Sequence, residues 1–126
     1  MGGLQRILMV DDESDIRTVA GLSLTVVGGF TVEMCGSGPE ALEKASAFGP
    51  DLILLDVMMP GMDGPTTLAR LREIPALHHT PAIFMTAKVQ PNEIAQLVAC
   101  GAMDVLAKPF DPMTLPDALR RIWGAR

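Results

Sequence analysis

The sequence predicts a single-domain α/β protein, built as a doubly wound parallel sheet of five strands with helices on both faces. Two observations predict this class. Apolar runs of strand length alternate with helical patterns along the whole chain, which is typical of repeated βα units. The 126 residues suffice for one hydrophobic core, and no linker or low-complexity tract interrupts the alternation. We therefore expect one domain over residues 1–126, with a core from about residue 5 to residue 123.

The first repeat is defined by its apolar spacing and by two glycines. The run at Arg6–Val10 has the length and composition of a strand. A helix is expected from about Ser14 to Val27, with one apolar stripe made by Ile16, Ala20, Leu24 and Val27. The glycines at 28 and 29 end this helix, and a second strand is expected at Thr31–Cys35.

Prolines and glycines mark the middle elements. Pro39 stands at a favourable first helical position, and the helix that it opens ends before Gly49. The run at Leu52–Leu55 is apolar on both faces, as expected for the central strand of a covered sheet. A third helix is expected at about Pro65–Glu73, and a fourth strand at Ala82–Met85.

The last repeat ends in an amphipathic helix. Pro91 opens the fourth helix, which is expected to end near Cys100 with Gly101 as a left-handed cap. The fifth strand is expected at Met103–Ala107, and the final helix presents one apolar face made by Leu115, Leu119, Ile122 and Trp123. Thr114 and Asp117 resemble a capping box, which would leave Pro116 in the first turn.

Bulk properties exclude several function classes. The net charge of −5, from 15 acidic and 10 basic residues, disfavours direct binding of nucleic acid. No apolar run approaches the ~20 residues that a membrane helix needs, so no membrane contact is expected. The N-terminus has no secretion signal, and the cytoplasm is the expected location.

Neither the cysteines nor the histidines predict a site. Cys35 and Cys100 lie far apart among apolar or small residues, and both are interpreted as buried, reduced thiols. His78 and His79 are adjacent, so their side chains point apart on a loop, and no further ligand is at metal-binding spacing. We expect them on the surface.

Five polar residues stand directly after predicted strands. They are Asp11 and Asp12 after the first, Asp56 after the third, Thr86 after the fourth and Lys108 after the fifth. In an open parallel sheet, ligands bind outside the carboxyl ends of the strands, near the point where strand order reverses. The order 2-1-3-4-5 would place the first and third strands side by side and bring the three aspartates together.

Carboxylates this close require a counter-charge. Two of them ~4 Å apart repel by ~4 kcal/mol at an effective dielectric of 20, so the trio either shares a proton or binds a cation. An all-oxygen site suits Mg²⁺, with Mn²⁺ as a substitute. Lys108 and Thr86 can receive phosphoryl oxygens, and a carboxylate can act as a nucleophile, so the inferred reaction is phosphoryl transfer onto Asp56.

At this point the chain resembles the receiver domain of two-component response regulators, whose fold is flavodoxin-like. The resemblance runs from VDDE through LLDVMMPGMDG and MTA to the KPF that begins at Lys108. It implies that Asp56 is the phosphoacceptor, Thr86 the switch hydroxyl and Lys108 the phosphate contact. It implies a metal site formed by Asp11, Asp12, Asp56 and the backbone carbonyl of Met58. It also implies a cis bond between Lys108 and Pro109.

The same resemblance implies a regulatory role. The phosphoryl group would come from a phosphohistidine on a sensor histidine kinase or a phosphotransfer protein, in a Mg²⁺-dependent reaction. The domain would catalyse only its own phosphorylation and dephosphorylation. A downstream protein would bind to the fourth helix, fifth strand and fifth helix, and the chain would be a monomer or a phosphorylation-linked dimer.

Three positions bear on how the signal would be carried. The family usually has Tyr or Phe three residues before the lysine, whereas this chain has Val105. Valine is too short and stiff to swing between buried and exposed states, so Thr86, its loop and the fourth helix would carry the signal. Met58 and Lys88 occupy the two variable positions that flank the site in this family, where a tuning role and simple surface packing are both open.

The sequence leaves two other functions open. A haloacid-dehalogenase-like phosphatase also forms an aspartyl phosphate, but such enzymes have a second Asp two residues after the nucleophile, where this chain has Met58. A pseudo-receiver that is never phosphorylated would act only as an interaction module. Whether the chain is a stand-alone protein or part of a longer one is also open.

Overall fold

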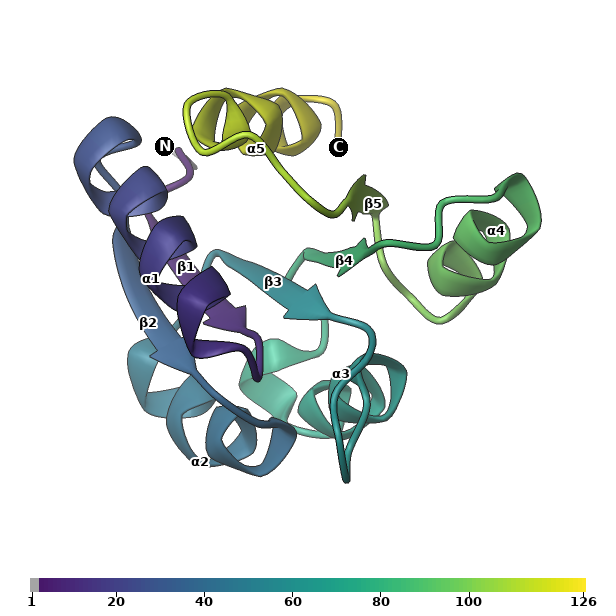
Figure 1. Ribbon diagram of the computed structural model, residues 1–126. Coiled ribbons are helices and arrows are strands. Elements are labelled where there is room, and N and C mark those ends of the chain that lie inside the picture. The colour runs from purple at the N-terminus through teal and green to yellow at the C-terminus, as the bar shows by residue number, and fades with distance from the viewer. Residues whose placement is uncertain (1–2) are drawn as a thin grey trace.

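Five parallel strands form one sheet in the order β2-β1-β3-β4-β5, as the sequence predicted (Figure 1). The computed structural model describes residues 3–126. The strands are β1 (Arg6–Val10), β2 (Thr31–Cys35), β3 (Leu52–Asp56), β4 (Ala82–Thr86) and β5 (Asp104–Ala107). The third and fourth strands thus each run one residue further than the apolar pattern indicates and include Asp56 and Thr86.

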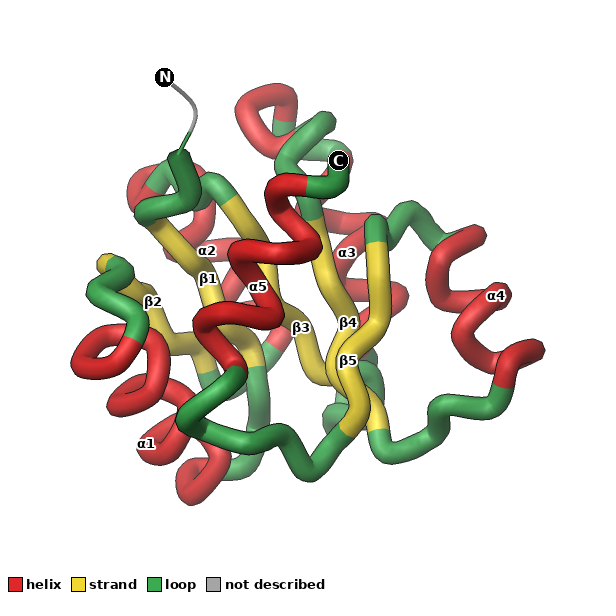
Figure 2. Tube along the Cα trace, turned by 90° about the horizontal axis from the view of Figure 1, so that it is seen from above, coloured by secondary structure: helices red, strands yellow, loops and turns green. Residues whose placement is uncertain are grey.

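Helices cover both faces of the sheet (Figures 1 and 2). They are α1 (Ser14–Leu22) with the π-helical turn η1 (Ser23–Val27), α2 (Gly38–Phe48), α3 (Gly64–Arg72) with the 3₁₀ turn η2 (Pro75–Leu77), α4 (Pro91–Ala99) and α5 (Leu115–Gly124). α1 and α5 lie on one face, and α2 and α3 on the other. α4 stands at the β4–β5 side, and no residue of it is fully buried.

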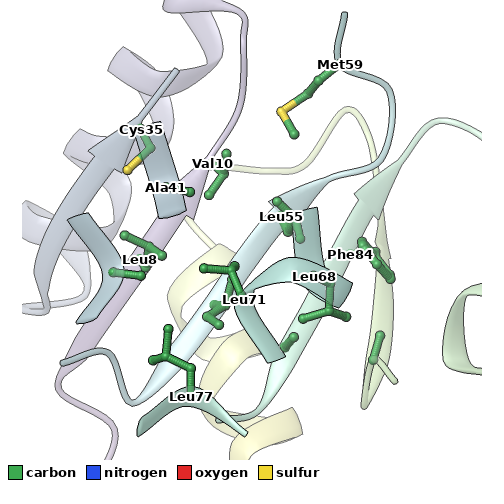
Figure 3. Packing of buried hydrophobic residues seen from close by; sticks show 14 residues of the cluster. Leu8, Val10, Cys35, Ala41, Leu55, Met59, Leu68, Leu71, Leu77 and Phe84 are labelled. Carbon is green, nitrogen blue, oxygen red and sulfur yellow. The ribbon is translucent and has the colours of Figure 1, made fainter. Parts of the chain in front are cut away.

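Alternating side chains of the central strands divide the core into two clusters. Leu8 and Val10 of β1 face α2 and α3, together with Leu55 and Phe84 (Figure 3). Their neighbours along the strands face α1 and α5, and these are Ile7, Met9, Leu52, Leu54, Ile83 and Met85. Because successive strand residues point to opposite faces, the continuous apolar runs fill both clusters. β3 is buried at all five positions, which confirms its central place.

Local capping sets where the helices nearest the site begin. Ser37 accepts a hydrogen bond from the backbone N–H of Glu40, and the Glu40 carboxylate accepts one from the N–H of Gly36. Asp63 accepts from the backbone N–H of Thr66 at 2.9 Å and so starts α3. Gly49 ends α2 in the left-handed conformation, with φ of 66°, at the point where the sequence predicted the end of this helix.

The apolar stripe predicted for the first helix is wrong at Val27. Ala20 and Leu24 are buried as expected, but the side chain of Val27 is exposed. The cause is the π-helical turn, in which the N–H of Gly28 donates to the carbonyl of Ser23, five residues back. The extra residue in that turn rotates Val27 off the buried face, and the chain then turns at Gly29 into β2.

Two predictions about residues at helix ends also need correction. Cys100 is exposed rather than buried, because α4 only half-buries Ile94 and Leu97 and the chain leaves it at Cys100. Thr114 makes no side-chain cap on α5, so the capping box predicted there is absent. Pro116 does lie in the first turn of α5, as predicted.

The other cysteine and the two histidines lie as expected. Cys35 is buried, and burial is the main reason why the pKa of its thiol rises to about 12, with the Glu40 charge adding to it. His78 and His79 are exposed. Among residues 3–126, no helix combines the length and the hydropathy that crossing a bilayer requires.

Candidate functional site

Strand register brings the predicted site residues to one edge of the sheet. Val10 of β1 pairs with Leu55 of β3, so the residues that follow them, Asp11 and Asp56, lie side by side. Thr86 pairs with Ala107 in the same way, which places Lys108 next to the end of β4. The loops leaving β4 and β5 run along this edge, the lower one in Figure 2. The four strand ends therefore converge as the sequence predicted.

The three aspartates form a compact acidic cluster. Asp11, Asp12 and Asp56 each offer a carboxylate oxygen, and these oxygens lie within 4.8 Å of one another. Asp11 is fully buried and Asp56 is 3% exposed, whereas Asp12 is half-buried. The cluster is thus open to solvent mainly on the side of Asp12.

The ammonium group of Lys108 contacts two carboxylates of the acidic cluster and neutralises part of their charge. Its ammonium nitrogen lies 3.0 Å from Asp11 Oδ2, 3.3 Å from Asp56 Oδ1 and 3.5 Å from Glu13 Oε1. Burial opposes the charged form of the lysine, but the hydrogen bond and charge of Asp11, together with Asp56, outweigh it and raise the pKa of Lys108. Lys108 therefore stays cationic at neutral pH.

The surroundings of Asp56 disfavour its charged form. Burial and the neighbouring charge of Asp11 raise the pKa of Asp56 to about 6, although Lys108 acts in the opposite direction. A single lysine thus compensates the cluster only in part. A second cation would relieve the remaining repulsion.

The donor set fits a hard divalent cation. All three side-chain ligands are carboxylates, and Mg²⁺ prefers oxygen ligands and keeps several of its own waters. The half-exposed Asp12 leaves room on the solvent side for such waters. Asp11, Asp12 and Asp56 would hold the ion, while the role of the Met58 carbonyl stays a prediction.

Thr86 lines the same cleft as Asp56 and Lys108. Its side chain is buried, and its hydroxyl oxygen accepts a hydrogen bond from the backbone N–H of Lys88 at 3.0 Å. The cleft has a volume of about 350 Å³ and is lined by Glu13, Ile16, Asp56, Met58, Thr86, Ala87, Lys108 and Pro109. Lys88 itself is exposed.

Two further sequence expectations concern the last strand. The bond between Lys108 and Pro109 is cis, as the resemblance implied. Val105 is half-buried and packs against the hydrophobic core cluster between the sheet and helices α2 and α3. It fills the position at which the family usually has an aromatic ring.

Two charged residues that contact the site were not among the residues predicted from the sequence. Glu13 pairs with Lys108, and the Arg17 guanidinium donates a hydrogen bond to the backbone carbonyl of Asp11 at 2.8 Å. Glu13 is the N-cap residue of α1, and Arg17 lies four residues further on, in the first turn of this helix. That spacing was the available signal.

The loop after β3 holds the backbone of Asp56 in place. The N–H of Gly64 donates to the carbonyl of Val57 at 2.9 Å. A Cβ atom at residue 64 would lie 2.3 Å from the carbonyl oxygen of Asp56. Glycine is therefore required for α3 to approach the end of β3 this closely.

Comparison with known proteins assigns this fold and site to one family. The family model of the response regulator receiver domain matches residues 7–120. The chain belongs to this family, and it is thus a receiver domain of the response regulators of two-component signalling.

Individual relatives support the same family assignment. The chain is 41% identical over 118 residues to the response regulator PleD of Caulobacter vibrioides, which covers 93% of this chain and 26% of PleD. It is 35% identical to the regulatory protein AtoC of Escherichia coli K12, over 88% of this chain and 23% of AtoC. The chain thus spans about a quarter of these two curated relatives.

Solved structures give the same fold. The chemotaxis protein CheY4 of Vibrio cholerae superposes with a TM-score of 0.88 at 34% identity, over 95% of this chain and 99% of that one. A response regulator from Desulfuromonas acetoxidans gives a TM-score of 0.84 at 28% identity, over 96% and 98% of the two chains.

Proposed function

We propose that this domain accepts a phosphoryl group on Asp56 from a phosphohistidine, carried by a sensor histidine kinase or a histidine phosphotransfer protein, in a Mg²⁺-dependent reaction. The observation that carries the proposal is the convergence of three carboxylates within 4.8 Å, bridged by Lys108 at 3.0 and 3.3 Å from two of them. Membership of the receiver family supports the same role.

In the proposed reaction, a carboxylate oxygen of Asp56 attacks phosphorus. The bond between phosphorus and the imidazole nitrogen breaks as the bond to Asp56 forms, and its electron pair returns to the imidazole. Lys108 lies close enough to both Asp56 and Asp11 to follow a phosphoryl oxygen as negative charge gathers there. Asp56 is itself only 3% exposed, and it lines the cleft through which the phosphoryl donor would reach it.

A divalent cation held by Asp11, Asp12 and Asp56 would withdraw charge from the phosphoryl oxygens and lessen the repulsion between the incoming group and the carboxylates. The chain's own contribution is positional, since Lys108 and the backbone around Asp11 hold the carboxylates at the cleft.

Phosphorylation would then shift a conformational equilibrium. It places about two negative charges and three acceptor oxygens between Lys108 and Thr86. The Thr86 hydroxyl now accepts from Lys88 N–H and would have to turn its proton toward the phosphoryl group. The loop from Thr86 to α4 would follow, and a partner protein would detect the change on α4, β5 and α5.

Labelling with a small phosphodonor tests the assignment. Wild-type protein incubated with acetyl phosphate and Mg²⁺ should incorporate one phosphoryl group, and Asp56→Asn should incorporate none. Asp51→Asn is the matched control, because Asp51 precedes the same strand at its opposite end, where it accepts from the N–H groups of Gln5 and Arg6. Equal incorporation by wild type and Asp56→Asn would refute the proposal, and no incorporation by wild type would favour the pseudo-receiver.

A phosphatase function is not supported. Met58 stands two residues after Asp56, where the phosphatase alternative requires a second acid, and its side chain is exposed. The receiver family accounts for the same chemistry without that acid. The domain therefore acts in our proposal as a regulated acceptor that turns over only its own phosphoryl group.

A further inference from the structure

We propose that Arg17 is a positioning residue for the metal-binding carboxylates, acting through the backbone between Asp11 and Asp12. Its Nη1 atom donates a hydrogen bond to the carbonyl oxygen of Asp11 at 2.8 Å. That carbonyl belongs to the peptide group that joins the two aspartates. A donor held on this oxygen fixes the plane of the peptide, and with it the direction in which the Asp12 side chain leaves the backbone.

The other polar groups of Asp11 already have hydrogen-bond partners. Its N–H donates to the carbonyl of Cys35 at 3.0 Å, its Oδ1 accepts from the N–H of Glu13 at 2.9 Å, and its Oδ2 accepts from Lys108. Arg17 supplies the contact on the side of Asp12. The half-buried Asp12, the most accessible of the three carboxylates, thus takes its orientation from the peptide that Arg17 holds.

The guanidinium is itself confined by neighbouring elements. A Cβ atom on Gly36, in the turn between β2 and α2, would lie 3.1 Å from Arg17 Nη1 and 3.4 Å from Cζ. The same atom would lie 3.6 Å from Glu40 Oε1, which accepts from the Gly36 N–H. Arg17 is therefore packed against the backbone of Gly36, with the Glu40 carboxylate close by. A side chain so confined can hold a peptide group more firmly than a mobile surface arginine can.

A positioning role and simple electrostatics predict opposite changes in Mg²⁺ affinity when Arg17 is removed. Arg17 is a cation close to an acidic site, so removing its charge should by Coulomb attraction alone strengthen the binding of Mg²⁺. If Arg17 orients the ligands, its removal should weaken that binding, because the carboxylates would have to be ordered by the ion itself. Loss of an outer contact of this kind typically costs about tenfold or more in metal affinity.

The test is a Mg²⁺ titration of the unphosphorylated protein, followed through the backbone amide NMR signals of Asp11, Asp12 and Lys108. We expect Arg17→Ala to raise the dissociation constant about tenfold, and Arg17→Lys, which keeps the charge and one donor, to fall between it and wild type. Arg70→Ala removes the same charge from the exposed face of α3 and should stay within about twofold of wild type. Thermal melts without metal check that each variant is folded, and Arg17→Gln takes the place of Arg17→Ala if the latter is not.

The inference rests on the metal site of the proposed function, and the two fail differently. Unchanged or tighter Mg²⁺ binding by a folded Arg17→Ala, beside normal binding by wild type, would overturn the role of Arg17 and leave the site intact. Equal weakening by Arg70→Ala would show that the loss of affinity is not specific to the contact that Arg17 makes, and would also overturn that role. Absence of Mg²⁺ binding by wild type would overturn the metal site itself, together with the inference.

Discussion

At the scale of single residues, Asp56 is a carboxyl group held where its charge is unfavourable. Its pKa is raised from 3.8 to about 6 by burial and by Asp11. The folded state therefore binds this proton more tightly than the unfolded chain, and stability falls as pH rises from about 4 to about 6. The charged form of Asp56 is thus maintained at the expense of stability, as is common for residues at functional sites.

Asp56→Asn should consequently stabilise the protein in the absence of divalent cations. At about pH 7.5 we expect a gain of about 1–3 kcal/mol in the free energy of unfolding, because the amide carries no charge to repel Asp11. The gain should shrink toward pH 4, where the wild-type carboxyl is protonated in the fold. Urea unfolding at both pH values in EDTA measures this, and a variant less stable than wild type at the higher pH would contradict it.

Lys108 has the opposite role, since it is the cation that the buried acids require. Lys108→Ala should lower stability by about 2–4 kcal/mol without metal, because it leaves Asp11 and Asp56 close together without a counter-charge. Lys44→Ala is the control, because Lys44 pairs with Glu40 on the surface at 2.8 Å, and its loss should hardly change the melting temperature. Similar melting temperatures for both variants would show that Lys108 is not a structural counter-ion.

At the scale of elements, the site depends on how the helices that follow the strands begin. Asp63 caps α3 directly after the loop that follows Asp56, whereas Thr114 makes no side-chain cap on α5. The two positions look alike in the sequence, since each offers a short polar side chain next to a proline-containing first turn. Only the backbone conformation separates them, with extended φ and ψ at Asp63 and helical values at Thr114.

Substitution of the two residues should therefore have unequal effects. Asp63→Ala should cost about 1 kcal/mol, because the Thr66 N–H loses its acceptor, while Thr114→Ala should stay within about 0.5 kcal/mol of wild type. Chemical denaturation of both variants against wild type provides the measurement. A loss at Thr114 that equals the loss at Asp63 would mean that the hydroxyl caps α5 after all.

The π-helical turn shows where element-scale prediction fails. The spacing of Ile16, Ala20 and Leu24 predicts a regular helix to residue 27, and local pattern contains nothing that signals a turn with one extra residue. A contact distant in sequence is made at this turn, since the buried Ser23 hydroxyl donates to the carbonyl of Pro112, 89 residues away. Cys100 was misplaced for a similar reason, since its exposure depends on how loosely α4 packs.

At the scale of the whole molecule, the architecture and the convergence of the site were predictable. Alternation of βα units with right-handed crossovers leaves few topologies, and every polar residue that follows a strand then reaches one edge. Asp11, Asp12, Asp56, Thr86 and Lys108 could be selected on that ground alone, and all five lie at the predicted edge.

The interactions within the site could not be predicted in the same way. Lys108 contacts Asp11 across 97 residues of sequence, and its distances to three different carboxylates follow from packing rather than from spacing. The hydrogen bond from Arg17 to a backbone carbonyl carries no residue-type signal at its acceptor, since every residue has such an oxygen. Family membership adds the class of reaction but not these contacts.

Chemical identification of the phosphorylated residue in the unmodified chain is the decisive test of phosphoryl transfer onto Asp56. Wild-type protein would be exposed to acetyl phosphate and Mg²⁺, reduced with borohydride, which converts an aspartyl phosphate to homoserine, and sequenced by tandem mass spectrometry. The account predicts homoserine at position 56, with Asp11 and Asp12 unchanged. Homoserine at Asp11, at Asp12 or at any position other than 56 would contradict it.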